Sequence, residues 1–326
     1  MFERVDIERI INYQKQSKNG YWPCLYSNCN ARAINSHIVQ RNRYLKLIAT
    51  DDNKVFVHET NFFKDPLTVF KQRGINQVLS FPGFCEKHDD TIFSSIEKRP
   101  IDFKNWRHIH LLCYRTELNE RRKKEIVIKM HEFVLSDKKL RGKIDTLHRS
   151  SLIEHISGNR EGIQDSRKTI TDIVGDLNSN FPTCFEHFSL EMPRTGVCIC
   201  GVFNLETTAD QQYRIRLTGK PYDYLSPIFI HLVPINKETD SLTITYEKGK
   251  KERVKNYLKH IFGTSQQERL KQLSDLLFLQ VENWICSKDF YIKNIKSREN
   301  YVVTMIERTM EVWDENAPME FNVFEN

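Results

Sequence analysis

The apolar positions in the first hundred residues predict a helix, a hairpin and an irregular segment. Residues 3–16 carry valine and isoleucine at helical spacing, which predicts a short amphipathic helix. Residues 44–59 contain two β-rich runs on either side of an Asp-Asp-Asn turn, a pattern typical of a β-hairpin. Prolines and glycines interrupt residues 58–84, so we expect an irregular segment there, before a helix over residues 88–97.

The middle of the chain, from about residue 103 to residue 177, has a strongly helical pattern. Residues 117–135 consist largely of good helix formers, and their apolar side chains recur on one helical face. Glycines mark possible breaks in this region, at Gly142, Gly158, Gly162 and Gly175.

From about residue 180 the pattern changes to short β-branched runs separated by turn residues. These runs predict strands of an antiparallel sheet at residues 197–206, 213–219, 226–235 and 241–249, with the clearest turn at 236–240. Two helical patterns follow, over residues 263–287 and 299–313, and Thr264 or Ser265 can cap the first, with Glu268 near the capping-box position. The predicted fold class is α+β.

Composition indicates a folded protein of two or three compact units. The chain has 326 residues, of which 39% are hydrophobic and 11% aromatic, so each unit can bury a core of its own. We expect no membrane association, because no run of eighteen apolar residues occurs and the charged start lacks the features of a signal peptide. The eight cysteines are scattered in a chain too large to need disulfides, which predicts a cytoplasmic protein.

Positive charge is concentrated between Lys98 and Arg149, a segment that we call the basic belt. It holds 15 Lys and Arg against 7 Asp and Glu, whereas residues 307–326 hold six acidic groups and one arginine. Such a belt can contact the phosphates of nucleic acid, although the same pattern is typical of a solvated helix face. The residues that we expect to meet phosphates are Arg121, Arg122, Lys123 and Lys124.

Four residues near the N-terminus have the spacing of a structural zinc site. Cys24 and Cys29 form one close pair, and Cys85 and His88 form a second pair at the start of a predicted helix. Thiolate and imidazole are the ligands that tetrahedral zinc prefers, and such sites take one close pair from each of two segments. A spacing of three on a helix puts Cys85 and His88 on one face. The alternative is that these cysteines are small buried hydrophobic residues and that His88 is a surface histidine.

The order of these motifs resembles the HNH nucleases. A cysteine pair is followed by Ser36-His37-Ile38 and then by Cys85-x2-His88-Asp89 opening a helix, and the segment 84–97 is also similar to uncharacterised bacterial proteins. The resemblance covers roughly residues 20–98. It implies a zinc-bound treble-clef (ββα) finger and metal-dependent hydrolysis of phosphodiester bonds in nucleic acid. By analogy with the family it also suggests a role in bacterial defence, such as antiviral defence, or a toxin-like role.

The resemblance also implies roles for two further residues. His37 corresponds to the family's general base, since a neutral imidazole can take a proton from a metal-positioned water that attacks phosphorus. Asp89 falls where the family commonly places a ligand of the catalytic divalent ion, here Mg²⁺ or a similar cation, which stabilises charge on the phosphate. An aspartate at a helix N-terminus can equally serve as a cap.

Three segments are therefore expected: a zinc finger domain over residues 1–100, a basic helical segment over 101–177 and an α+β domain over 178–326. The last carries no catalytic signature and could recognise a protein partner. The main hypothesis is a metal-dependent endonuclease. The alternative is a non-catalytic zinc finger that binds nucleic acid or a protein; Ser36, which stands where many HNH members carry an acidic residue, favours this alternative, and His37 favours the nuclease.

Overall fold

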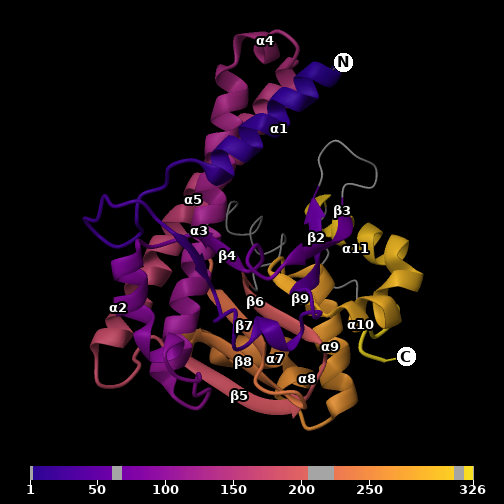
Figure 1. Ribbon diagram of the computed structural model, residues 1–326. Coiled ribbons are helices and arrows are strands. Elements are labelled where there is room, and N and C mark those ends of the chain that lie inside the picture. Colours follow the sequence, from indigo (N-terminus) through magenta and orange to yellow (C-terminus); the bar gives the residue numbers. More distant parts are fainter. Residues whose placement is uncertain (1–2, 61–67, 205–223, 312–318, 326) are drawn as a thin grey trace. The chain divides into compact units, whose positions relative to one another are not determined.

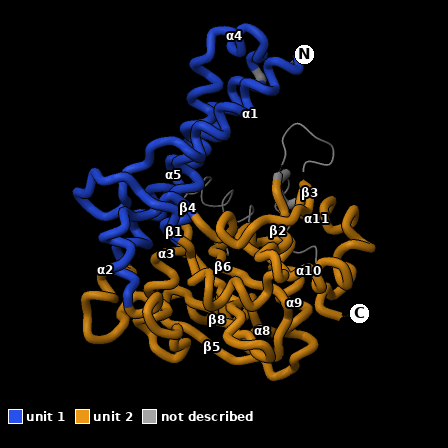
Figure 2. Tube along the Cα trace, in the orientation of Figure 1, with its two compact units in different colours: residues 1–36, 81–94, 117–172 blue, residues 37–80, 95–116, 173–326 orange. Residues whose placement is uncertain are grey.

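The computed structural model of the chain is an α+β protein, described over residues 3–60, 68–204, 224–311 and 319–325 (Figure 1). Two compact units divide the chain, and each draws on several stretches of sequence (Figure 2). Unit 1 comprises Met1–Ser36, Phe81–Ser94 and Glu117–Asp172; unit 2 comprises His37–Ser80, Ser95–Thr116 and Ile173–Asn326. This division differs from the three sequential segments expected from the sequence.

Unit 1 is mainly helical. It contains α1 (Arg4–Asn19), most of α2 (Glu86–Glu97), the larger part of α3 (Trp106–Ser136), α4 (Lys138–Arg141) and most of α5 (Thr146–Asn178). The short strands β1 (Asn35–His37) and β4 (Ser80–Pro82) pair as a two-stranded sheet.

Asp137 ties α1 to the turn between α3 and α4. Its side chain caps α4 by accepting hydrogen bonds from the backbone N–H groups of Lys139 at 2.8 Å and Leu140 at 3.2 Å. The same carboxylate accepts from Arg9 at 2.9 Å and from the Tyr13 hydroxyl. One buried anion therefore serves both as a helix cap and as the anchor of the N-terminal helix.

Unit 2 contains a seven-stranded sheet of order β3-β2-β9-β6-β7-β8-β5. Every pairing for which a register is known is antiparallel, and in the centre Ile199 lies opposite Leu232, which lies opposite Leu242. The strands are β2 (Lys54–Thr60), β3 (Thr68–Gly74), β5 (Phe185–Pro193), β6 (Val197–Asn204), β7 (Pro227–Pro234), β8 (Thr239–Glu247) and β9 (Trp284–Cys286).

Both faces of the central strands are buried within unit 2. One face, which includes Ile230 and Ile244, shares a hydrophobic core with the C-terminal helices. On the other face His231 meets Thr116 of α3 at 2.9 Å. The C-terminal elements are η2 (Lys248–Lys250), α7 (Lys251–Tyr257), α8 (Lys259–Phe262), α9 (Gln266–Leu279), α10 (Lys288–Phe290), the π-helical turn η3 (Tyr291–Ile295), η4 (Lys296–Arg298) and α11 (Glu299–Glu311).

Most expected elements are confirmed, including α1, α2, the helical middle and the antiparallel sheet. Ser265 caps α9 by accepting from the N–H of Glu268, as expected. Gly142 ends α4, but the other three glycines expected to break the helical region lie inside α5. The strand predicted over residues 213–219 lies outside the described residues.

The predicted hairpin over residues 44–59 is wrong in its first half. Residues Leu45–Leu47 form a short 3₁₀ helix, η1, because Tyr44, Leu45 and Ile48 bury their side chains together at helical spacing. The second run forms β2, which pairs instead with β3, a strand inside the segment expected to be irregular. β9 is a second correction, since Trp284–Cys286 was expected to continue a helix.

Candidate metal centre

Cys24 and Cys29 lie on a tight hairpin in unit 1, which we call the knuckle hairpin (residues 21–34). The N–H of Cys24 donates to the carbonyl of Ala31 at 2.8 Å, and the N–H of Ala33 donates to the carbonyl of Trp22 at 2.9 Å. The turn closes where Cys29 N–H donates to the Tyr26 carbonyl at 3.1 Å, with Asn28 in the left-handed region at φ 59°. Asparagine tolerates this conformation better than most residues.

Cys85 and His88 lie at the start of α2, also in unit 1. The N–H of Asp89 donates to the Cys85 carbonyl at 2.9 Å, so Cys85 immediately precedes the first helical turn and His88 lies within it. The expected helical spacing is confirmed, and it directs both side chains to the same side.

Backbone hydrogen bonds join the knuckle hairpin to the segment before α2. Leu25 N–H donates to the Gly83 carbonyl at 3.0 Å, and Ile34 N–H donates to the Phe84 carbonyl at 2.7 Å. The Ser36 hydroxyl accepts from the N–H of Phe84 at 3.4 Å. Gly83 is required here, because a Cβ atom at this position would lie 2.7 Å from the Phe81 ring. The two ligand pairs are thus held together by the chain itself.

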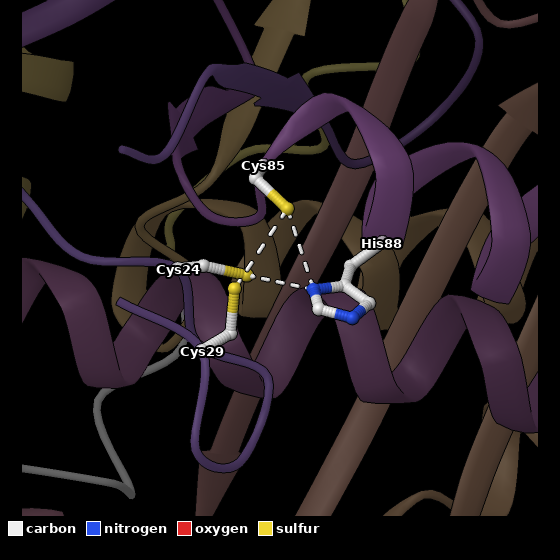
Figure 3. A group of neighbouring side chains, drawn as sticks. All are labelled: Cys24, Cys29, Cys85 and His88. Carbon is white, nitrogen blue, oxygen red and sulfur yellow. Dashed lines mark hydrogen bonds between the residues drawn. The ribbon is translucent and has the colours of Figure 1, made fainter. Parts of the chain in front are cut away.

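The four donor atoms converge on one point, as Figure 3 shows. Nδ1 of His88 lies 3.4 Å from Sγ of Cys24 and 3.3 Å from Sγ of Cys85, and the Cys29 and Cys85 sulfurs are 4.0 Å apart. All four atoms lie within 4.8 Å of one another. Tetrahedral zinc requires sulfurs about 3.8 Å apart and sulfur–nitrogen distances of about 3.6 Å, given the usual bond lengths. The group could hold a metal ion such as zinc.

The surroundings of Cys24, Cys85 and His88 differ. The N–H of His88 lowers the pKa of the Cys85 thiol, whereas burial raises the pKa of Cys24. Tyr26 stacks on the His88 imidazole, with ring centroids 4.0 Å apart and planes 22° apart, and so fixes the ring that presents Nδ1. Sequence reasoning missed this tyrosine, although an aromatic residue between two ligands is a recognisable signal.

His37, the expected general base, ends β1 and belongs to unit 2. Its Nε2 lies 3.1 Å from the Ile75 carbonyl, which can only accept, so Nε2 carries the hydrogen and Nδ1 keeps a lone pair. Burial lowers the pKa of His37 more than this hydrogen bond raises it, and the charges of Arg41 and Arg115 lower it further. The imidazole is therefore neutral near pH 7.

Asp89, the expected ligand of a catalytic ion, lies in the first turn of α2 in unit 1. It is half-buried and directly follows His88. His37 and Asp89 thus belong to different units, and their cooperation stays a prediction. Among the described residues, Cys24, Cys29, Cys85 and His88 form the single group of three or more potential ligands.

The four residues of the basic belt expected to meet phosphates differ in their surroundings. Arg122 is 1% exposed, so the prediction that it contacts phosphate is corrected: its guanidinium lies over the Trp22 ring and donates to the Pro23 carbonyl at 2.8 Å. Arg121 pairs with Glu125 at 3.0 Å and Lys123 with Glu120 at 3.1 Å, but both retain partial exposure. The proposed phosphate contacts are therefore limited to Arg121, Lys123 and Lys124.

Comparison of the chain with protein-family models, with curated proteins and with solved structures finds no match. Within the described part of the chain, no helix combines the length and apolarity of a membrane span.

Proposed function

We propose that this protein is a zinc-stabilised, metal-dependent endonuclease of the HNH-like type, which hydrolyses phosphodiester bonds in nucleic acid. The zinc ion would be structural, held by Cys24, Cys29, Cys85 and His88. With all four positions taken by protein, no position remains for a water nucleophile at that ion. The chemistry would therefore depend on other residues.

The observation that carries the proposal is the contact between Nε2 of His37 and the Ile75 carbonyl, 3.1 Å apart. A general base needs an unprotonated nitrogen near neutral pH, and the hydrogen bond from Nε2 to Ile75 leaves Nδ1 to accept a proton. The lowered pKa keeps the ring neutral. Nδ1 would remove a proton from the water that attacks phosphorus, while the Ile75 carbonyl keeps the ring oriented.

A divalent ion such as Mg²⁺ would stabilise the charge that develops on the scissile phosphate. Asp89 supplies one carboxylate, which fits an ion that usually takes one or two protein carboxylates and completes its shell with water and substrate phosphates. Asp89 is the favoured ligand because it directly follows His88 in the first turn of α2.

The alternative function is a non-catalytic finger that binds nucleic acid or a protein. One observation favours it: the same hydrogen bond to Ile75 could serve only to hold β1 in place. In that case His37 would be a structural histidine, and no phosphodiester would be cleaved.

Cleavage of plasmid DNA and of RNA in Mg²⁺, Mn²⁺ or Ni²⁺ tests the proposal. The wild-type protein should cleave one of these substrates, and His37→Ala should lose roughly 10²–10⁴-fold of the rate with unchanged zinc content. Asp89→Ala should show a similar loss, partly restored by high metal concentration. His148→Ala is the matched control, because the His148 side chain is 74% exposed and should tolerate the change.

Two outcomes contradict the proposal. If the wild-type protein cleaves neither substrate in any of the three metals, the finger is structural. If His37→Ala retains full activity, the base lies elsewhere in the chain.

A further inference from the structure

The knuckle hairpin has an inner and an outer face, set by its register. Pro23 lies opposite Arg32 in an antiparallel bridge, between the hydrogen-bonded pairs formed by Trp22 with Ala33 and by Cys24 with Ala31. Continuing this register places Tyr21 opposite Ile34. Since side chains alternate along each strand, Tyr21, Pro23, Arg32 and Ile34 share one face.

The inner face makes its contacts within unit 1 through Trp22 and Cys24. Cys24 points to the metal centre, and the Trp22 indole donates to the Ser17 carbonyl at 2.9 Å. The Trp22 ring lies beside two cations, 4.5 Å from the Arg122 guanidinium and 4.8 Å from the Lys129 ammonium. These contacts anchor the hairpin within unit 1.

The outer face is open to solvent. Tyr21 is 59% exposed and Ile34 is 43% exposed, and both Pro23 and Arg32 are also exposed. The Tyr21 hydroxyl donates to the Asn30 carbonyl at 2.6 Å, which holds the ring along the hairpin while leaving a broad part of its surface uncovered. Large exposed apolar side chains gathered on one face indicate a binding surface.

The charge of the segment that contains the hairpin indicates which kind of partner this face binds. Between residues 9 and 36 there is no aspartate or glutamate, and the charged residues are Arg9, Lys15, Lys18 and Arg32. Arg9 is engaged by Asp137, whereas the other three cations are exposed. A hairpin without acidic residues of its own, with an aromatic ring and a guanidinium, suits a polyanion that also presents flat apolar groups.

We propose that the outer face of the knuckle hairpin binds unpaired nucleotides of a single-stranded nucleic acid, with a base stacked on Tyr21 and phosphates near Arg32 and Lys18. Stacking requires bases free of a duplex, and every base has a π-face, so the contact is insensitive to sequence. The inference rests on the proposed function, because it names the strand state of that substrate. A protein partner could use the same aromatic and arginine contacts, but the acid-free charge pattern favours nucleic acid.

The test is equilibrium binding by the full, zinc-loaded chain, measured by fluorescence anisotropy without added Mg²⁺ so that no cleavage is needed. The probes are an oligo-dT, an oligo-U and a duplex of the same length. One single strand should bind more tightly than the duplex, and Tyr21→Ala should weaken its binding by roughly tenfold to a hundredfold. Tyr21→Phe keeps the ring and should stay close to wild type. Arg32→Ala should reduce the salt dependence of binding by about 0.7 in logarithmic slope.

Phe181→Ala is the matched control, because Phe181 is an aromatic residue of unit 2 that is 66% exposed. The inference is overturned if Tyr21→Ala and wild type bind the probes with equal affinity, or if both prefer the duplex. It is also overturned if no probe binds, and a protein would then be the partner of this face. Binding that depends on Tyr21 without cleavage in Mg²⁺ would support this surface and reject the nuclease. If Tyr21→Ala cleaves nucleic acid and binds the probes as well as wild type does, the nuclease is supported and this surface is rejected.

Discussion

Nδ1 of His88 lies 3.4 Å from Sγ of Cys24, although 64 positions separate the two residues in the chain. Sγ of Cys29 and Sγ of Cys85 lie beside this pair, and one cation could contact all four donor atoms, because they lie within 4.8 Å of one another. Bound zinc would neutralise the thiolates and cross-link the knuckle hairpin to α2. Binding energy of this kind is folding energy, on the order of 10–16 kcal/mol in isolated zinc-finger peptides.

Cys85→Ser should therefore release zinc and unfold the knuckle hairpin, because three remaining ligands hold the ion much more weakly. Hydrogen exchange followed by mass spectrometry should show lost protection over residues 21–36 and 81–94, with the sheet of unit 2 still protected. Cys184→Ser is the control, since Cys184 is half-buried and outside the ligand group. Equal protection in the two variants would mean that the metal does not hold the hairpin.

Arg122→Ala should destabilise unit 1 by about 2–4 kcal/mol, because it removes packing on Trp22, one of the two arginines that pair with Glu125, and the hydrogen bond to the Pro23 carbonyl. Arg121→Ala should change the free energy of unfolding by about 0.5 kcal/mol or less, since Arg121 forms one partly exposed i,i+4 pair. Urea unfolding, followed by circular dichroism, measures both. Similar effects from the two neighbouring arginines would contradict the anchoring role of Arg122.

If the basic belt contacts phosphates, replacing Arg121, Lys123 and Lys124 together by glutamine should flatten the salt dependence of duplex DNA binding. The expected change in logarithmic slope is up to about 0.9 per lost contact. Arg122 is kept in this variant, because its side chain is buried. An unchanged slope would indicate that these cations serve only their partners on α3.

Unit 2 should lose stability in mild acid because of His231. The Thr116 hydroxyl donates to the Leu112 carbonyl, so it accepts from Nε2 of His231, and no described residue offers a partner to Nδ1. Burial lowers the pKa of His231 to about 3, below the unfolded value of about 6.5. In mild acid His231 is therefore protonated in the unfolded state but stays neutral in the folded state. The stability that neutral His231 contributes is fully present only above the unfolded pKa and is lost as the pH falls below it.

Between pH 7.5 and pH 5 this histidine should lower the free energy of unfolding by about 2 kcal/mol. His231→Gln keeps a donor for Thr116 but cannot titrate. The difference in the free energy of unfolding between wild type and His231→Gln should therefore shrink as the pH falls. Denaturant unfolding at a series of pH values tests this, with the exposed His148→Gln as control. A difference independent of pH would show that His231 does not supply the acid sensitivity.

The candidate metal centre could be predicted because its sequence pattern is local: two close pairs of potential ligands, one of them at helical spacing at the start of a helix. The residues that pack around this centre could not be predicted from the sequence. Arg121 and Arg122 are adjacent in sequence and identical in type, yet Arg122 alone is buried, since only the fold brings Trp22 and Pro23 to it.

The sheet shows the same division between local and tertiary information. Strands β6, β7 and β8 carry dense β-branched runs and were predicted. β9 has three residues and follows a helical pattern, and it is a strand because β2 and β6 pair with its two edges. The run at Leu45 shows the converse: burial at helical spacing overrides β propensity.

Cobalt substitution tests the metal centre most directly, because Co²⁺ reports the number and type of its ligands through its visible absorption spectrum. The purified chain should bind one equivalent of Co²⁺ with the intense bands of a tetrahedral ion and a sulfur-to-metal charge-transfer band. Zinc should displace it stoichiometrically, and Cys24→Ser, Cys29→Ser and Cys85→Ser should each weaken the charge-transfer band. A weak octahedral spectrum, or a tetrahedral spectrum unchanged in all three variants, would contradict a centre built from Cys24, Cys29, Cys85 and His88.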